Sequence, residues 1–265
     1  MNNVINLTRP ITPHSPAGTY LPWEAPYRVE DIVTLKVNGA NLFHITMGSG
    51  AATRLLAPNL GDPEAATTRD LAPERLLNRE ATVVRVTPAP GGALEADRLR
   101  AAIEAAAPRH GDAVVLVTGW GDTDHWRTDE QYYLDTPFLP EPAAETLAEL
   151  LSGLGVDLLL TDCAYLDQPR RSPLAQEWIS LPPWLRPPWP SDATRVYLDH
   201  YRPDQARRDW AATLALTSRI WSVVGLVGCG ALPGTRTRLT IAPLPVEGVG
   251  EVPCTVIAFP TGDGA

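Results

Sequence analysis

The sequence predicts one α/β domain in which helices flank a mixed central sheet. Short apolar runs typical of buried strands alternate along the chain with longer segments that have helical spacing. Residues 113–117 form a nearly continuous apolar run, which is typical of a buried strand, and residues 156–162 are predicted to form the next buried strand. Residues 95–107 and 142–154 are rich in alanine and leucine at helical intervals. Because no internal repeat interrupts this alternation, we expect residues 1–265 to form a single domain.

Further strands are predicted toward both ends of the chain. In the N-terminal part, residues 32–37 and 41–47 alternate around Asn38-Gly39, a pair that favours a two-residue hairpin turn. The other segments with β-like composition are residues 4–8, 82–86, 240–245 and 252–259, and residues 209–224 have the pattern of a helix followed by a strand.

Residues 169–203 depart from this alternation. Trp178, Trp184 and Trp189 stand there among many prolines. Proline fixes φ and removes a hydrogen-bond donor, which excludes a regular helix or a central strand. The aromatic content is too high for a disordered linker. We therefore predict an ordered insertion that serves as a lid or as an arm packing on a neighbouring subunit.

The composition restricts the class of partner. The formal net charge is −9 and the pI about 5.0, which argues against nucleic acid because phosphate binding needs a basic surface. A content of 44% hydrophobic and 20% charged residues is that of an ordinary soluble protein, and no apolar run approaches the length of a membrane span. Three cysteines and an N-terminus without signal-peptide features predict a cytoplasmic protein. We therefore expect a small-molecule substrate, and neither nucleic acid nor a membrane as partner.

The most informative pattern is Met-Gly-Ser-Gly-Ala-Ala-Thr-Arg-Leu-Leu-Ala-Pro-Asn-Leu at residues 47–60. It resembles the signature His-x-Gly-Thr-His-x-Asp-Ala-Pro-x-His of the metal-dependent cyclase family, which includes kynurenine formamidase-like and isatin hydrolase-like enzymes. Residues 118–120 resemble the family's Thr-Gly-Trp, and Asp162 and Asp167 match its Gly-x-Asp-Thr-x-Ser-x-Asp. The resemblance covers nearly the whole chain outside residues 169–203. It implies the family's swivelling β/β/α sandwich, with a mixed central sheet and peripheral helices.

The same motif lacks the family's metal ligands. A divalent cation needs imidazole, carboxylate or thiolate donors, and a guanidinium adds positive charge where the cation would lie. No His or Glu lies between residues 209 and 232, where the second half of the family's site is expected. The family's ligand positions carry residues without a suitable donor: Gly50, Arg54, Leu56 and Leu60 in the signature, and Ala212 and Val224 in the second half. We therefore expect neither a metal nor another cofactor.

Three side chains are candidates for catalysis without a metal. Arg54 can hold a carboxylate or an enolate oxygen with its fork of N–H donors; alternatively it fills the vacated space and pairs with an acid such as Asp162. His125 follows the carboxyl end of a central strand, where open α/β sheets bind ligands, and imidazole is suited to proton transfer near neutrality. A solvated surface histidine is the alternative there. Asp162 can act as a base or orient His125 or Arg54.

Aromatic residues near the predicted loop tips suggest a pocket for a planar organic ligand. Each of them alone is also typical of a hydrophobic core. A cysteine in this region is either a nucleophile, which requires a lowered pKa, or a buried inert thiol. The predicted substrate-binding residues are Tyr20, Trp23, Trp120, Trp126, Cys163 and Tyr165.

The leading hypothesis is a metal-independent cyclase-family enzyme. It would perform ring closure, dehydration or C–O/C–N cleavage on a small carbonyl-containing, cyclic or aromatic metabolite in secondary metabolism. One alternative is a catalytically silent homologue that binds a ligand or stabilises a partner subunit. Another is a metal-dependent amide or lactone hydrolase with relocated ligands. The resemblance also implies a homodimer or a homotetramer.

Overall fold

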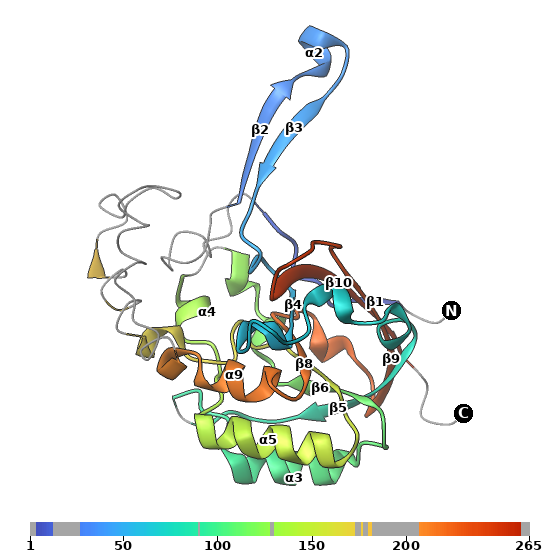
Figure 1. The fold of residues 1–265 in the computed structure, drawn as a ribbon, viewed down its shortest axis with the longest axis vertical. Helices are drawn as coiled ribbons and strands as arrows, with labels where there is room; N and C mark the ends of the chain where they lie inside the picture. Colours follow the sequence, from blue (N-terminus) through green and yellow to red (C-terminus); the bar gives the residue numbers. More distant parts are fainter. Residues whose placement is uncertain are drawn as a thin grey trace.

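A ring of strands forms the centre of the protein (Figure 1). The structure, a computed structural model, describes residues 4–12, 27–89, 91–127, 130–172, 176, 180–181 and 207–260. Within this part, eight strands form one sheet in the order β1-β10-β4-β8-β7-β6-β5-β9, and β9 also pairs with β10, so that seven strands close on themselves. The strands are β1 (Ile5–Asn6), β4 (Arg54–Leu56), β5 (Arg79–Arg85), β6 (Ala113–Val117), β7 (Leu158–Thr161), β8 (Trp221–Val224), β9 (Arg236–Pro243) and β10 (Glu251–Pro260).

The sheet is mixed. Strands β5, β6, β7 and β8 are parallel to one another, as the apolar runs predicted. Strand β4 is antiparallel to both of its neighbours, β8 and β10, and β9 is antiparallel to β5 and β10. Every residue of β6 and of β7 is buried, because these strands are covered on both sides.

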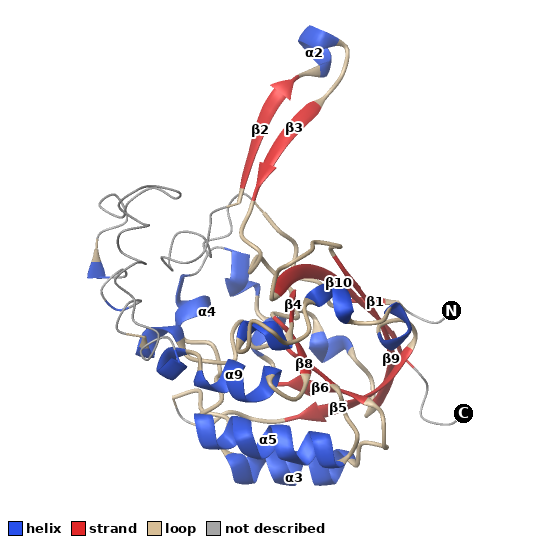
Figure 2. Ribbon diagram, viewed as in Figure 1, coloured by secondary structure: helices blue, strands red, loops and turns tan. Residues whose placement is uncertain are grey.

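Helices cover the outside of the parallel strands (Figure 2). They are α3 (Ala96–Ala106), α5 (Glu141–Gly153) and α9 (Ala211–Thr217). Alternate residues of β6 separate two apolar layers: Val115 packs inside the ring, whereas Val114 and Leu116 pack against α3 and α5. The predicted fold class, a mixed central sheet with peripheral helices, is confirmed.

A two-stranded hairpin extends away from this body (Figure 1). Strand β2 (Arg28–Val33) leads through one helical turn, α2 (Leu35–Asn38), into strand β3 (Leu42–Thr46). We call residues 28–46 the arm. None of residues 27–51 is buried. The arm ends one residue before the motif at residues 47–60.

The tip of the arm differs from the predicted two-residue turn. The strand ends at Val33 instead of continuing to residue 37, and Gly39 terminates α2 in the left-handed conformation, with φ of 74°. The side chains of Asn38 and Asn41 accept hydrogen bonds from the backbone N–H groups of Thr34 and Leu35. These local bonds compete with the strand ladder, so the helical turn forms instead.

The remaining elements are short. They comprise the helix α4 (Glu130–Leu134) and the 3-10 turns η1 (Pro58–Leu60), η2 (Thr68–Asp70), η3 (Pro73–Arg75), η4 (Trp120–Asp122), η5 (Asp124–Arg127), η6 (Pro169–Arg171) and η8 (Cys229–Ala231). Of the predicted insertion at 169–203, only residues 169–172, 176 and 180–181 are described, so its role as a lid or subunit arm lies outside the described residues. Among the described residues, no helix has the length and apolar character to cross a membrane.

Candidate functional site

The motif at residues 47–60 contains β4, which lies between β8 and β10 in the sheet. Arg54 lies opposite Val224 of β8 on one side and Pro253 of β10 on the other. Thr53 fixes the approach to the strand: its hydroxyl donates to the Gly225 carbonyl at 2.7 Å and accepts from the Arg9 backbone N–H at 2.8 Å. The two halves of the family site, which are far apart in sequence, are therefore neighbours in the sheet.

Apolar packing occupies the family's ligand positions. Leu56, Ala212 and Val224 belong to one buried cluster between the sheet and the helices. Leu60 lies against Gly250 at the surface, where a Cβ on the glycine would come within 2.8 Å of the leucine side chain. None of these side chains has a lone pair to offer, so the residues present do not fit a divalent cation. Within the described part of the chain, no group of three or more His, Cys, Asp or Glu residues is placed to hold a metal ion.

Arg54 is buried at the centre of this region, with 5% of its surface exposed. Its Nε lies 3.3 Å from Oε2 of Glu251, and its guanidinium lies 4.7 Å above the ring of Tyr165. The ion pair lacks hydrogen-bond geometry, and both Nε and Nη1 of Arg54 are buried without a hydrogen-bond acceptor. These two nitrogen atoms can still donate hydrogen bonds to an anionic oxygen.

Glu251, rather than Asp162, is the acid beside Arg54. Its carboxylate also accepts a hydrogen bond from the Ser49 hydroxyl at 3.3 Å, and a Cβ on Gly50 would come within 2.9 Å of it. The small residue at position 50, where the family has a histidine, thus makes room for this carboxylate. Sequence analysis missed Glu251 because Ser49 and Glu251 are 202 residues apart and no local pattern relates them.

Asp162 is completely buried after β7 and holds the loop that follows β6. Its carboxylate accepts hydrogen bonds from the backbone N–H and hydroxyl of Thr118 and from the N–H of Gly119, each at 2.8 Å, and from the N–H of Gly121 at 3.4 Å. Burial raises the pKa of Asp162, and these hydrogen bonds oppose that shift. No hydrogen bond or ion pair joins Asp162 to His125 or Arg54, so the predicted contact with either residue is not observed.

His125 lies in η5 and is exposed. The neighbouring Trp126 is buried, and its carbonyl accepts a hydrogen bond from the Tyr133 hydroxyl at 2.8 Å. The structure thus separates the predicted proton-transfer pair: His125 is at the surface of the loop after β6, whereas Asp162 lies in the interior.

The predicted aromatic residues do come together. Trp126 and Tyr165 share a buried cluster with Tyr132 and Tyr133, and the partly buried Trp120 packs against it. Trp120 stacks on Tyr132 with ring centroids 5.5 Å apart. Tyr20 and Trp23, the other two aromatic candidates, lie outside the described residues.

Tyr132, Tyr133 and Arg9 were missed by sequence analysis. Arg9 is buried, lies 5.1 Å above the Tyr133 ring and donates to the Ala52 carbonyl at 2.8 Å. The Tyr132 hydroxyl is buried without a hydrogen-bond partner, and burial raises its pKa. The two adjacent tyrosines, in a segment that forms α4, were the sequence feature that could have indicated further members of the aromatic cluster. A second buried guanidinium, from the N-terminal segment, is therefore held by the carbonyl of Ala52, two residues before Arg54.

Cys163 is buried among the residues that follow β7. Burial strongly raises the pKa of its thiol, and the nearby Asp162 carboxylate raises it further. Such a thiol remains protonated at neutral pH. The structure therefore agrees with the inert alternative rather than with a nucleophile.

The fold and the motif define the class of protein: a mixed α/β sheet that closes into a ring, in which the motif at residues 47–60 supplies strand β4. Residues 5–164 match the sequence model of the family described as "Putative cyclase". This match covers more than half of the chain, and the chain belongs to that family.

Solved structures with the same fold include isatin hydrolases. Isatin hydrolase A from Ralstonia solanacearum superimposes with a TM-score of 0.66 and 16% identity, over 98% of this chain and 92% of that one. An isatin hydrolase bound to the product analogue thioisatinate gives a TM-score of 0.67 and 18% identity, over 98% and 93%. A potential metal-dependent hydrolase with cyclase activity gives 0.64 and 15%, over 98% of both chains. No curated protein matches. At these identities the structural likeness demonstrates the fold, and family membership supports an enzyme of the cyclase or hydrolase type.

Proposed function

We propose that this protein is a cyclase-family enzyme that stabilises negative charge with Arg54 instead of a divalent cation. Its substrate is a small carbonyl-containing, cyclic or aromatic metabolite, and the reaction is a ring closure, a dehydration or a C–O/C–N cleavage. We place this chemistry in secondary metabolism.

The unused donors of Arg54 are the observation that supports this proposal. A carbonyl that gains negative charge during attack or enolisation needs fixed N–H donors in a dry environment. Nε and Nη1 of Arg54 are buried and lack acceptors, and the stacking on Tyr165 holds the plane of the guanidinium. Glu251 compensates part of the charge without hydrogen-bonding to these donors.

Proton transfer is assigned to His125, with Asp162 in a positioning role. Asp162 orders the loop from Thr118 to Gly121, and that loop leads directly into the η5 turn that contains His125. The aromatic cluster around Trp126, which is buried beside the loop, is the planar apolar wall that we propose for the substrate.

The first test is turnover of a panel of cyclic carbonyl compounds, including isatin, with EDTA present throughout. We expect wild-type turnover to persist in EDTA, and we expect Arg54→Ala to lower kcat by about 10²–10³-fold, the effect of removing an oxyanion donor. Arg69→Ala is the matched control, because Arg69 is an exposed arginine paired with Glu247. Loss of all turnover on chelation, restored by zinc or manganese, would contradict the proposal.

A second function is favoured by the packing of the ligand positions. Leu56, Ala212 and Val224 fill the space with apolar side chains, which is expected of a homologue that binds a ligand or supports a partner without catalysis. Calorimetric titration with benzoate, a planar carboxylate, separates the two functions. Binding that needs Arg54, combined with no turnover across the panel, would favour the silent homologue.

A further inference from the structure

Glu251 is a carboxylate at the site to which the proposed function gives only the role of a counter-ion. Its Oε2 lies 3.3 Å from Nε of Arg54, in a contact that lacks hydrogen-bond geometry. In the described part of the chain, the Ser49 hydroxyl is the one group that donates a hydrogen bond to it, at 3.3 Å. An ionised carboxylate has about four lone-pair positions, so most of the acceptor capacity of Glu251 is unused.

Asp162 differs from Glu251 in both respects that matter for proton transfer. Its carboxylate accepts four hydrogen bonds that hold the loop after β6, and it is completely buried. The Glu251 side chain is 29% exposed, whereas the Arg54 side chain that it contacts is 5% exposed. Glu251 therefore contacts both solvent and the buried guanidinium, and it can exchange a proton with water.

The position of the Glu251 carboxylate is fixed by the sheet and by the motif. Glu251 is the first residue of β10 and lies opposite Leu56 of β4, two residues after Arg54. The motif adds the Ser49 hydrogen bond and the small Gly50, on which a Cβ would come within 2.9 Å of Oε1 of Glu251. Groups that are held by strands keep a more precise geometry than groups on loops.

A carboxylate beside a guanidinium with unused donors suits proton abstraction next to a carbonyl group. When a base takes a proton from the α carbon, the negative charge passes from the base to the carbonyl oxygen, which becomes an enolate. Nε and Nη1 of Arg54 are buried without acceptors, so the enolate oxygen can bind there. The charge then begins and ends beside the same guanidinium, and no uncompensated charge arises in the buried site.

We propose that Glu251 is the general base of this enzyme and that its substrate is a carbonyl compound with a hydrogen on the α carbon. This inference rests on the proposed function, in which Arg54 stabilises the developing oxyanion. It selects dehydration and ring closure from the reactions named there, because both begin with an enolate.

The proposed steps balance without an oxidant or a reductant. The Glu251 carboxylate takes the α proton, and the electron pair of the C–H bond forms the C=C bond of the enolate on Arg54. In dehydration the enolate re-forms the carbonyl, the bond to a β-hydroxyl group breaks, and His125 donates the proton with which that group leaves as water. In ring closure the enolate carbon attacks a second carbonyl of the substrate, and His125 protonates the new alkoxide. Glu251 then releases its proton to solvent, and His125 regains one from it.

Deuterium exchange tests the first step alone. Indanone, α-tetralone and chromanone are the probes, since each is a cyclic aromatic ketone with α hydrogens that proton NMR can follow in heavy water containing EDTA. We expect the wild type to accelerate exchange above the buffer rate, and Glu251→Gln to lower this acceleration by about 10²-fold or more, the effect of removing a general base. Isatin has no α hydrogen, and we expect no turnover of it.

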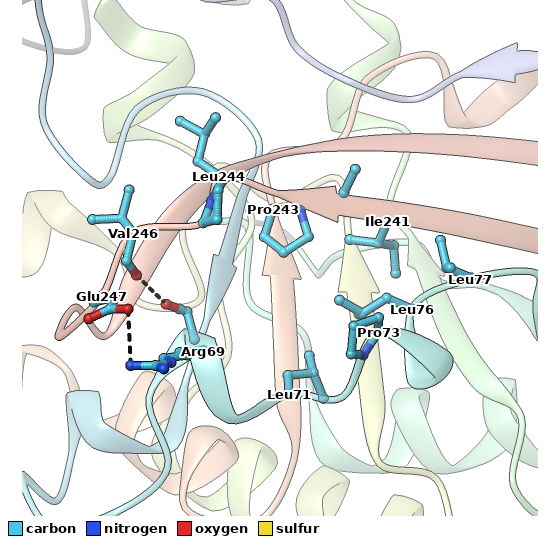
Figure 3. Close-up of a pocket in the computed structure, with 13 residues that line it drawn as sticks. Arg69, Leu71, Pro73, Leu76, Leu77, Ile241, Pro243, Leu244, Val246 and Glu247 are labelled. Carbon is cyan, nitrogen blue, oxygen red and sulfur yellow. Dashed lines mark hydrogen bonds and ion pairs between the residues drawn. The ribbon is translucent and has the colours of Figure 1, made fainter.

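Glu247→Gln is the matched control. Glu247 lies in the turn that leads into β10 and pairs with the exposed Arg69 at 3.0 Å, away from Arg54 (Figure 3). This variant removes the same charge from the same turn, so it should exchange the probes at the wild-type rate. Circular dichroism verifies that both variants are folded. Equal losses in Glu247→Gln and Glu251→Gln would overturn the proposal.

Chemical rescue separates a base from a structural residue. Glu251→Ala leaves space beside Arg54 that a small carboxylate can enter from solvent, because Glu251 is partly exposed. We expect formate to raise the exchange rate of Glu251→Ala in proportion to its concentration, and to leave the rate of Arg54→Ala unchanged. A folded Glu251→Ala protein that formate does not accelerate would contradict the assignment of the base.

The outcomes also distinguish this inference from the proposed function. EDTA-resistant turnover that requires Arg54 but persists fully in Glu251→Gln would refute the base and retain the function. Turnover of isatin would refute the requirement for an α hydrogen and also retain the function. A wild type that neither exchanges the ketone probes nor turns over any compound of the panel would overturn both.

Discussion

The arm and β4 are consecutive in sequence and opposite in environment. No residue of the arm is buried, whereas every residue of β4 is buried, and only residues 47–53 separate the two. Both segments contain leucine, isoleucine or phenylalanine, so composition does not distinguish them. Strand β4 has a neighbour on each edge and helices over one face, whereas each arm strand has one neighbour. Burial in this protein therefore follows from sheet position rather than from local hydrophobicity.

The largest expected effect comes from shortening an apolar side chain in each region. Leu55 packs inside the ring and is fully buried, so Leu55→Ala should lower the free energy of unfolding by about 2–5 kcal/mol. Phe43→Ala on the arm should change the monomer by no more than about 0.5 kcal/mol. Urea unfolding at low protein concentration measures both. Equal losses would show that the arm packs against its own body.

A pH effect comes next, from a buried carboxylate that holds the start of α9. Asp167 accepts hydrogen bonds from the backbone N–H groups of Ala212 and Thr213 and from the Thr213 hydroxyl, and burial raises its pKa to about 6 from 3.8. Between these values the folded state binds more protons than the unfolded state. The contribution of Asp167 to stability therefore falls as pH rises from about 4 to 6, by at most roughly 3 kcal/mol.

Asp167→Asn tests this sign. Relative to the wild type, the variant should lose the falling part of the curve of unfolding free energy against pH between about 4 and 6. Asp70 is the exposed counterpart: hydrogen bonds from Thr67 lower its pKa, so its contribution is lost as pH falls. Asp70→Asn should thus alter the curve in the opposite direction. The same slope in Asp167→Asn as in the wild type would exclude a raised pKa for this carboxyl.

A smaller effect is expected at the ion pair between Arg54 of β4 and Glu251 of β10. Glu251→Gln leaves the buried Arg54 without its counter-charge and should cost about 1–2 kcal/mol, less than for a fully buried pair because Glu251 is 29% exposed. Adding Arg54→Met to this variant should restore part of the loss. A double-mutant cycle measures the coupling, and a coupling energy near zero would remove Glu251 from the site.

The smallest effect is expected on the arm. His44→Ala breaks the pair with Glu30, but both side chains are more than 60% exposed, so the change in stability should be below about 0.5 kcal/mol. Thermal unfolding in low and high salt provides the measurement. A larger loss would mean that this face of the arm is covered in solution.

Sequence analysis predicted what depends on local pattern. The parallel strands and α3 and α5 were evident because strands covered on both faces are continuously apolar and helices have periodic apolar residues. The motif on β4 was also evident, because its frame of Thr53, Ala57 and Pro58 is local.

The remaining features depend on contacts between distant segments. Closure of the ring requires β9 and β10 to pair while β10 also reaches β4 and β1, which no local pattern encodes. The Arg54–Glu251 pair follows from that closure. The prediction of a two-residue turn at the arm tip was wrong, because the side chains of Asn38 and Asn41 hydrogen-bond to the backbone there and favour a helical turn.

The position of β10 in the ring has a consequence for folding during synthesis of the chain. This strand joins β1, β4 and β9, and its pairing with the N-terminal segment brings together residues as distant in sequence as Ile5 and Ala258. On the ribosome, the four parallel strands can assemble early, but β4 keeps an open edge and Arg54 remains without a counter-ion until residues 251–260 emerge. Folding is therefore expected to finish slowly, once β10 is available, and a nascent chain stalled before Glu251 would expose the unpaired edge of β4, to which chaperones can bind.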